Sequence, residues 1–409
     1  MIYDVIIIGG GISGLYSFYK IKQLYKNKTK NKKNCLLLEK DNRLGGRAGN
    51  DNFHGAQIAI GAGILRKNKD KLLINLCKKL KVPLSEFTAN INYDKIKNQI
   101  PIINIIKTLR KLKSSMKTLS EKKKRFFTFK QYFISIFGKK YYNNFKKTLG
   151  YTDYENEDMK EVINHYGMDD NLSGWKGYGL SWNTLIEKLA KNIGKKNIKM
   201  NTSVEKIKLE NNDIYKITTN NKTYYAKKII IGTTIDTIKK LVKSNIYNNI
   251  GGQPFLRIYG IFEKKCIPIL KNAVNSTTIV NSPLYKIIPI NPDKGIYMIV
   301  YSDNKGSLAL KKYIKNTPAN RQYLSKMVSK SLGITSTVCK LKDIKSYYWN
   351  IGTHYYKPLK NLKFKDRNDY IKKAQNPQKN MYVVGEMISH KQGWTEGAIE
   401  SVEKIIYKI

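Results

Sequence analysis

The sequence predicts an α/β fold in which a doubly wound, mostly parallel sheet is assembled from segments far apart in the chain. A continuous apolar run at 2–8 precedes a helical stretch at 12–25, and "NMYVVGE" at 380–386 precedes another at 397–409. Continuous apolar runs are typical of strands covered on both faces. Between these two ends, helix-like and strand-like blocks indicate insertions that form a second, mixed α+β domain.

The other elements are predicted in chain order from the spacing of apolar residues. A second strand, "CLLLE" at 35–39, completes the first β–α–β unit. The remaining predictions are an exposed loop at 26–34, helices at 70–80, 101–149 and near 320–332, and strands across 198–231 and 255–301.

The length and composition indicate a folded protein of two domains in a reducing compartment. A chain of 409 residues with 41% hydrophobic content is too long to fold around one small hydrophobic core and suits two domains. The four cysteines show no CxxC spacing, so neither a disulfide framework nor a zinc site is expected from them. No apolar run reaches the roughly 18 to 20 residues that span a bilayer, and the N-terminus does not resemble a signal peptide. The expected location is cytoplasmic, either host cytoplasm or virion if the protein is viral.

The chain is strongly basic, with a net charge of +46. Such a charge favours contact with polyanions, at least without specificity. The lysines are spread along the whole chain, however, which also fits compositional drift in an A/T-rich coding sequence. The densest basic stretch, "KTLRKLKSSMKTLSEKKKRFF" from Lys107, is the best candidate for a true patch.

Three glycines at the first strand–helix junction predict a Rossmann-like dinucleotide site. Gly9, Gly11 and Gly14 form G-x-G-x-x-G. The first allows a tight turn, the second a close approach to a pyrophosphate, and the third close packing of helix on sheet. The helix N-terminus would then face the phosphates. Glu39 ends the second strand, where a carboxylate can accept hydrogen bonds from a ribose. These residues alone do not decide between NAD and FAD.

The stretch "LEKDNRLGGRAGN", with Gly45, Gly46 and Arg47, resembles the flavin amine oxidase superfamily, which includes monoamine, polyamine and L-amino-acid oxidases. Three further stretches resemble the same family: "HGAQIAIGAG", "NTSVEKI" with Val204 at the adenine-contacting position, and "VVGEMISHKQGWTEGAIESVEKI". In the last one, a helix beginning near Thr395 would direct its positive end at the flavin. "GYTDYENED" and "QGWTEGAIESV" are also similar to flavin oxidoreductases of large DNA viruses.

The resemblance implies FAD as the cofactor, bound non-covalently because no cysteine occurs in 345–360. It implies a FAD-binding domain at 1–90, 176–243 and 370–409, and a substrate domain at 91–175 and 244–369. The residues expected to bind the cofactor are Gly9, Gly11, Ile12, Ser13, Gly14, Glu39, Lys40, Gly45, Gly46, Arg47, Gly61, Ala62, Val204, Gly385, Glu386, Trp394, Thr395 and Ala398.

Catalysis in this family moves a hydride from a carbon next to an amine to flavin N5, and dioxygen then reoxidises the flavin. The resemblance implies two aromatic rings beside the amine, for which Tyr355 and Trp394 are the candidates. The alternative is that both are ordinary core aromatics. Arg257 stands where amine-oxidising members usually carry a lysine. Arginine cannot act as a base, but it can hold water or bind a substrate carboxylate.

The expected function is therefore FAD-dependent oxidation of an amine or amino acid, with a small-molecule substrate. Two alternatives remain: a desaturase of the protoporphyrinogen or phytoene type, and a flavin-fold protein that binds a partner or nucleic acid through its basic surface. His354 is expected to form hydrogen bonds near the site. His54, His165 and His390 show no metal-ligand spacing, and no metal is expected. The oligomeric state is not predicted.

Overall fold

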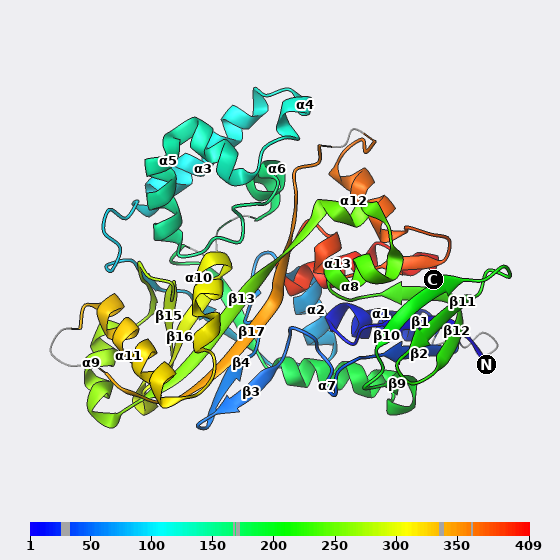
Figure 1. Ribbon diagram of the computed structural model, residues 1–409, viewed down its shortest axis with the longest axis horizontal. Helices are drawn as coiled ribbons and strands as arrows, with labels where there is room; N and C mark the ends of the chain where they lie inside the picture. Colours follow the sequence, from blue (N-terminus) through cyan, green and yellow to red (C-terminus); the bar gives the residue numbers. More distant parts are fainter. Residues whose placement is uncertain (26–32, 167, 169–171, 335–338, 361–362) are drawn as a thin grey trace.

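The computed structural model describes residues 1–25, 33–166, 168, 172–334, 339–360 and 363–409. Most of the predicted loop at 26–34 lies outside these residues. Within the described part, a seven-stranded sheet has the order β10-β11-β12-β1-β2-β9, and β18 also pairs with β12 (Figure 1). Its strands are β1 (Ile2–Ile8), β2 (Cys35–Leu38), β9 (Ile198–Lys199), β10 (Val204–Leu209), β11 (Tyr215–Thr219), β12 (Thr223–Ile231) and β18 (Met381–Val383).

The centre of this sheet is parallel and buried on both faces. Strand β1 pairs in parallel with β2 and β12, and β12 pairs in parallel with β18. Val5 and Ile7 of β1 belong to one hydrophobic cluster, whereas Ile6 and Ile8 belong to another. Because successive side chains alternate across a strand, the continuous apolar run at 2–8 serves both faces.

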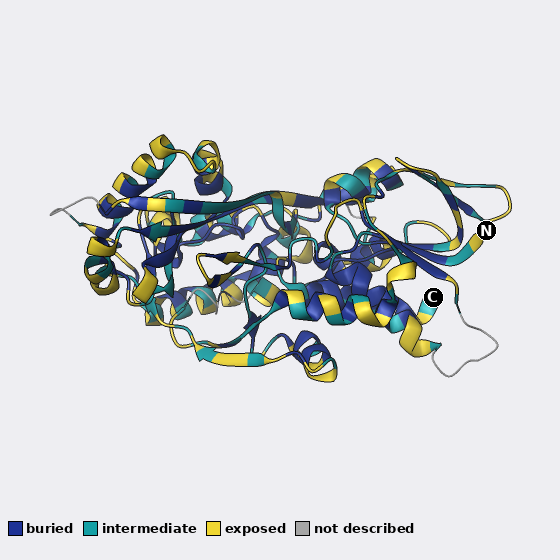
Figure 2. Ribbon diagram, turned by 90° about the horizontal axis from the view of Figure 1, so that it is seen from below, coloured by how far each residue is buried: buried dark blue, intermediate teal, exposed yellow. Residues whose placement is uncertain are grey.

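Helices cover both faces of the sheet. The first cluster includes residues of α1 (Ile12–Leu24), α2 (Lys71–Lys79), α7 (Trp182–Ile193) and α13 (Thr395–Glu403). The second cluster includes residues of α8 (Ile235–Val242) and α12 (Arg367–Gln375). Figure 2 shows helices with dark-blue buried sides and yellow exposed sides, as expected for helices packed on a core.

A second sheet has the strand order β17-β13-β16-β15-β14-β7. The strands are β7 (Ile91–Asn92), β13 (Ile250–Phe262), β14 (Thr277–Ile279), β15 (Lys286–Asn291), β16 (Ile296–Asp303) and β17 (Leu341–Tyr356). The long antiparallel pair β13–β17 runs through the middle of the molecule (Figure 1). Ile250 and Tyr356, at one end of this pair, pack in the core of the first sheet. The two sheets are therefore joined by continuous strands.

Helices and short strand pairs complete the fold. Residues of α9 (Ile267–Ala273), α10 (Asn304–Leu310) and α11 (Pro318–Leu332) pack on the second sheet. A separate block contains α3 (Ile102–Lys117), α4 (Glu121–Lys124), α5 (Phe129–Leu149), α6 (Met159–Glu161) and the π-helical turn η1 (Val162–Tyr166), and it has its own aromatic-rich core. The small sheets pair β3 (Asn50–Phe53) with β4 (Ala56–Ala59), and β5 (Leu65–Arg66) and β6 (Leu84–Thr88) with β8 (Lys176–Leu180).

The predicted α/β class, with a discontinuous Rossmann-like part and a mixed α+β part, is confirmed. The strands of the two large sheets fall within the segments predicted for the two domains, but the domain boundaries themselves stay a prediction. Strand β17 was not predicted, because many of its side chains are half-buried and the apolar pattern is weak. The expected strands across 255–301 are interrupted by α9. None of the helices in the described ranges combines the length and apolarity needed to cross a membrane.

Candidate active site

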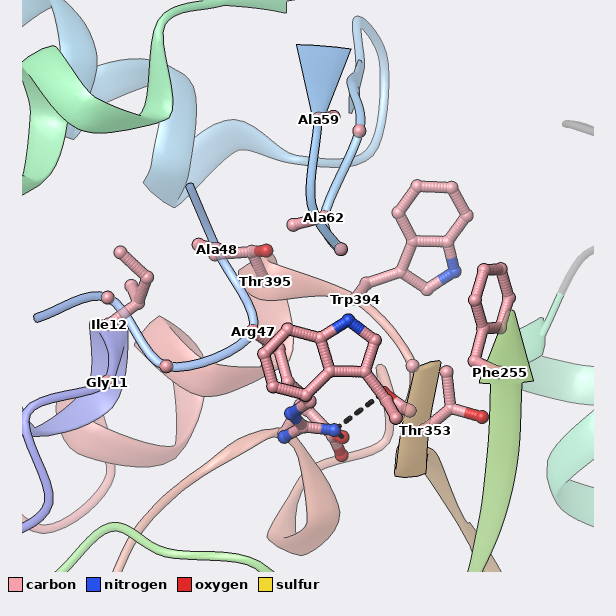
Figure 3. Close-up of a pocket in the computed structure, with 18 of the residues that line it drawn as sticks. Gly11, Ile12, Arg47, Ala48, Ala59, Ala62, Phe255, Thr353, Trp394 and Thr395 are labelled. Carbon is pink, nitrogen blue, oxygen red and sulfur yellow. Dashed lines mark hydrogen bonds and ion pairs between the residues drawn. The ribbon is translucent and has the colours of Figure 1, made fainter. Parts of the chain in front are cut away.

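A cavity of about 1300 Å³ is lined by residues from both sheets. It is larger than the roughly 300–1,000 Å³ of a pocket for one small ligand, so it has room for a dinucleotide and a substrate. In Figure 3, Gly11 and Ile12 lie on one side of Arg47, and Thr353 and Phe255 lie on the other. The cavity thus extends from the glycine-rich turn to the second sheet.

The glycine-rich turn after β1 is shaped by close backbone approach. A Cβ on Gly9 would lie 2.5 Å from the carbonyl oxygen of Gly232, and Gly9 has a φ of +101°. A Cβ on Gly14 would lie 1.9 Å from the carbonyl oxygen of Gly9, so both positions need glycine for packing. A Cβ on Gly11 would meet no protein atom within 4 Å, although Gly11 lines the cavity. The space above Gly11 is therefore available to a ligand.

Helix α1 begins at Ile12 with no side-chain cap from Gly11. Its first N–H groups lack helical partners, and the helix dipole adds partial positive charge at this end. Ile12 and Ser13 line the cavity. A helix start with these features is a ready anion site, so the turn fits the pyrophosphate of a dinucleotide.

The carboxylate of Glu39, at the end of β2, is buried and ties the turn in place. It accepts hydrogen bonds from the backbone N–H groups of Gly10, at 2.5 Å, and Asp41, at 2.9 Å. The next glycine segment lies alongside, because Gly45 donates its N–H to the carbonyl of Gly10 at 2.8 Å. Both glycine segments therefore line one end of the cavity.

The carboxylate of Glu386 joins segments that are far apart in sequence. Its Oε1 accepts hydrogen bonds from Arg47 Nη1 and from His354 Nδ1, each at 2.7 Å. His354 Nε2 accepts the N–H of Ile235 at 3.2 Å, so the proton of the neutral ring lies on Nδ1. Burial alone would raise the pKa of Glu386, but His354 and Arg47 lower it to about 2. The buried Oε2 has no partner among the described residues, which leaves an acceptor for a ligand.

Helix α13 begins at Thr395, at the cavity wall. Its Glu396 accepts the N–H groups of Leu72, at 3.1 Å, and Leu73, at 2.8 Å, and so fixes α13 to the start of α2. The preceding residue, Trp394, also lines the cavity, and the guanidinium carbon of Arg66 lies 3.8 Å from its ring centroid. The helix start is thus held rigidly beside an aromatic wall.

Two buried cations line the part of the cavity in the second sheet. Arg257 on β13 and Lys286 on β15 are each 5% exposed. The guanidinium carbon of Arg257 lies 4.8 Å from the ring centroid of Tyr301, and the Lys286 Nζ lies 5.7 Å from the same centroid. The Tyr301 ring stacks on Tyr151 at 5.7 Å. The Arg257 Nε is buried without a partner among the described residues.

The structure does not bring Tyr355 to this cavity. Its ring covers Gly251, where a Cβ would lie 2.3 Å from the Tyr355 ring. The register between β13 and β17 shifts between Gln253 and Phe255, and the ring of β17 that lines the cavity is Trp349, which donates its Nε1–H to the carbonyl of Ile60 at 2.8 Å. Tyr355 is therefore not among the residues that line the cavity, and its expected part in catalysis stays an untested prediction.

All the other predicted site residues except Gly14 line the cavity. Gly14 lies behind the lining, where it packs against the backbone of Gly9. Which of them contact a cofactor stays a prediction. Sequence reasoning missed Trp349 and the two-cation cluster, as well as the segment after β12. There the signal was available: "IIIGTT" ends a buried parallel strand with glycine at the same sheet edge as Gly9. The residues of this segment at the cavity are Gly232, Thr233, Thr234, Asp236 and Thr237.

Comparisons with known proteins agree with this geometry. The family model for flavin containing amine oxidoreductase matches residues 22–403. An uncharacterized protein of Acanthamoeba polyphaga mimivirus, R188, is 22% identical over 501 residues, covering 99% of this chain and 93% of the relative. Among solved structures, a double mutant of putrescine oxidase has a TM-score of 0.74 at 13% identity, covering 100% of this chain and 99% of the other. Wild-type putrescine oxidase bound to putrescine also has a TM-score of 0.74, at 12% identity and the same coverage.

Substitutions of two glycines separate packing from ligand space. Gly14→Ala should destabilise the flavin-free protein by about 1–3 kcal/mol, because the new Cβ overlaps the backbone of Gly9. Gly11→Ala should leave the unfolding midpoint of the flavin-free protein unchanged but weaken FAD binding about 5- to 150-fold, since its Cβ enters the ligand space. Urea unfolding and FAD titration measure the two effects. Equal destabilisation by both substitutions would contradict this account.

The charge network at Glu386 predicts a pH-dependent contribution to stability. The pKa in the folded protein, about 2, lies below the ordinary value of 4.5, so the stabilisation is full above about pH 4.5 and is lost as the pH falls toward 2. Glu386→Gln should therefore lower the free energy of unfolding by about 3 kcal/mol near neutral pH, and this difference should shrink below about pH 4.5.

The control for this prediction is Glu86→Gln, which breaks an exposed ion pair with Lys67 and should have little effect at any pH. Unfolding is followed in denaturant from about pH 6 to about pH 3. A difference for Glu386→Gln that stays constant across this range would show that the ionised carboxylate is not stabilised by its neighbours.

Proposed function

The chain belongs to the flavin-containing amine oxidoreductase family, and from that membership we propose that it oxidises the carbon–nitrogen bond of a substrate bearing both an amine and a carboxylate. It is an FAD-dependent oxidoreductase of the amine oxidase type. The proposal adds the class of substrate, an amino acid or an acidic amine, and dioxygen as the electron acceptor.

The observation that supports this substrate class is the buried guanidinium of Arg257, whose Nε has no partner among the described residues; Lys286 lies against the same Tyr301 ring and adds positive charge to this wall. Burying a charged side chain is costly unless an opposite charge meets it. A carboxylate can bind the planar fork of Arg257 with two parallel hydrogen bonds and can also face Lys286. A diamine would instead bring further positive charge to the same wall, which like-charge repulsion disfavours. The putrescine bound by the matched oxidase is such a diamine, but that likeness extends to the fold alone.

The same cavity offers an anionic group for an ammonium. Asp153 lines the cavity and accepts a hydrogen bond from the Tyr166 hydroxyl at 2.6 Å. Asp303 does not line the cavity, and it accepts a hydrogen bond from the N–H of Thr152, the residue before Asp153. Burial raises the pKa of Asp303 to about 6, and the interactions with Thr152 and Lys286 oppose this rise. An amino acid carries both charges that these walls would recognise.

The residues around the cofactor site fit FAD and indicate how the chain would use it. When bound, FAD would supply the redox chemistry, as the hydride acceptor for the amine-bearing carbon with dioxygen as the proposed final electron acceptor. The start of α13 at Thr395 supplies partial positive charge where negative charge develops. Trp349 and Trp394 provide apolar walls that exclude water. Arg47, Glu386 and His354 form one hydrogen-bonded group that joins three segments of the chain beside the cavity.

Anaerobic reduction tests the substrate class. The purified protein with FAD is mixed with amino acids, with the matching amines that lack the carboxylate, and with diamines, and bleaching of the visible flavin band is recorded. Bleaching by amino acids but not by diamines is expected. Bleaching by diamines alone would contradict the proposal, and a flavin band that no amine or amino acid bleaches would favour a binding role instead.

Arg257→Met should raise KM for the amino acid about 30- to 5,000-fold, because removing one partner of a buried charge pair costs about 2–5 kcal/mol. The KM for the matching amine without a carboxylate should change little. The control is Arg321→Met, since Arg321 lies on α11 outside the cavity lining. Equal losses for both substrates would show that Arg257 holds the site together rather than binding the carboxylate.

A further inference from the structure

Three potential metal ligands meet outside the cavity. Glu161 ends α6, His165 lies in η1, and His390 lies between η8 (Glu386–Ile388) and α13. One ligand atom from each residue lies within 4.8 Å of the others. The histidine spacing in the sequence did not predict this cluster, because His390 reaches it only through the fold.

Local backbone geometry explains why Glu161 and His165 point the same way. They are four residues apart on one continuous helical segment, and residues at this spacing share a face. The second part of that segment is a π-helical turn, Val162–Tyr166. Such turns are rare, and they occur frequently at functional sites.

With the Asn368 amide in its present orientation, the contacts of His390 favour a positive charge beside Glu161. Its Nε2 lies 2.8 Å from Asn368 Oδ1, an acceptor, so Nε2 carries a proton. Its Nδ1 lies 2.8 Å from Glu161 Oε2. In a neutral ring with its proton on Nε2, the lone pair of Nδ1 would face a lone pair of the Glu161 carboxylate, which is repulsive. A second proton on the ring would turn this contact into an ion pair, whereas a metal ion bound by both atoms would move them slightly apart.

The position of His165 favours the metal ion over the proton. The rings of His165 and His390 have centroids 4.3 Å apart with an interplanar angle of 31°. A proton would join only His390 and Glu161, whereas one ligand atom from each of the three residues lies within 4.8 Å of the others. A divalent ion would instead use both rings in their neutral form, as metal-binding histidines are.

We propose that Glu161, His165 and His390 bind a divalent transition metal of the zinc class. Ligand atoms of a tetrahedral zinc site lie about 2.0–2.2 Å from the ion, so small side-chain movements suffice to close this cluster. Because His165 is exposed, water completes the fourth position. Asn368 fixes the tautomer of His390 from behind, as outer partners of metal-bound histidines do.

Charges around the cluster are mixed. Arg367 lies 3.7 Å from the other oxygen of Glu161 and 3.0 Å from Asp158. Glu157 is also buried nearby, and burial together with Glu161 raises its pKa. Glu400 and Lys404 both lie near His165, and their opposite charges act on it in opposite directions. Arg367 lies on the Oε1 side of the Glu161 carboxylate, so Oε2 faces His390 and the proposed ion.

The consequence is structural. The ion would fasten the helical block that contains α6 and η1 to the segment leading into Trp394 and Thr395, which line the cavity. This inference does not depend on the substrate class, because no ligand of the ion lines the cavity.

Zinc binding to the full-length protein tests the proposal. Protein treated with a chelator is titrated with zinc chloride in competition with a chromophoric chelator, and the bound metal is quantified. The wild type should bind one zinc ion per chain. His165→Ala should weaken binding by more than the roughly 10- to 100-fold that loss of an outer partner costs, and Asn368→Ala should weaken it within that range. His54→Ala removes an exposed histidine paired with Asp343 and should have no effect.

His165→Ala decides the test, because its side chain is exposed and the fold should tolerate its loss. Circular dichroism and FAD binding confirm folding of each variant. Absence of zinc binding in the wild type would overturn the proposal and leave a protonated His390 paired with Glu161. Unchanged zinc affinity in His165→Ala would overturn it equally, since the metal would then bind elsewhere.

Discussion

The carboxylate of Glu386 is the point on which the arrangement of the cavity depends. It is buried and ionised, and it accepts hydrogen bonds from Arg47, which follows Gly45 and Gly46, and from His354 of β17. Those partners also reach backbone groups at Gly352 and Ile235. A buried charge is stable only when it is paired and hydrogen-bonded, so displacement of the segment of Arg47 or of His354 would remove one of the two partners of the carboxylate. The two sheets are therefore fixed relative to each other at the place where the cofactor and the substrate must meet.

Much of the cofactor end could be predicted from sequence because backbone geometry demands particular residues there. Gly9 and Gly14 are required by approaches of 2.5 and 1.9 Å, and such constraints leave a readable pattern. The substrate end left no such pattern. Trp349 lines the cavity and Tyr355 does not because the two rings lie at different points along the β13–β17 pair, opposite Phe255 and Gly251 respectively. No local sequence rule reports which point of a long strand reaches the cavity. Lys286 and His390 join their clusters only through long-range pairing of segments.

The chain keeps the fold and cofactor seat of its family but lines the substrate end with cations. Fold likeness carries no information on the substrate, so the proposed substrate class rests on the charges of the cavity wall. Arg257 and Lys286 are held among Tyr151, Phe255 and Tyr301, whose ring faces attract cations and help offset the loss of hydration. The resulting wall is preorganised for an anionic group before any substrate arrives.

The most direct measurement of the central claim is calorimetric titration of the flavin-free protein with FAD and, separately, with FMN. The cavity extends from the glycine turn and Glu39 to the start of α13, so the protein should bind one FAD per chain. It should bind FMN much more weakly, because FMN lacks the adenosine half that the Glu39 end would hold. Equal affinity for both flavins, or a folded protein that binds neither, would contradict the account.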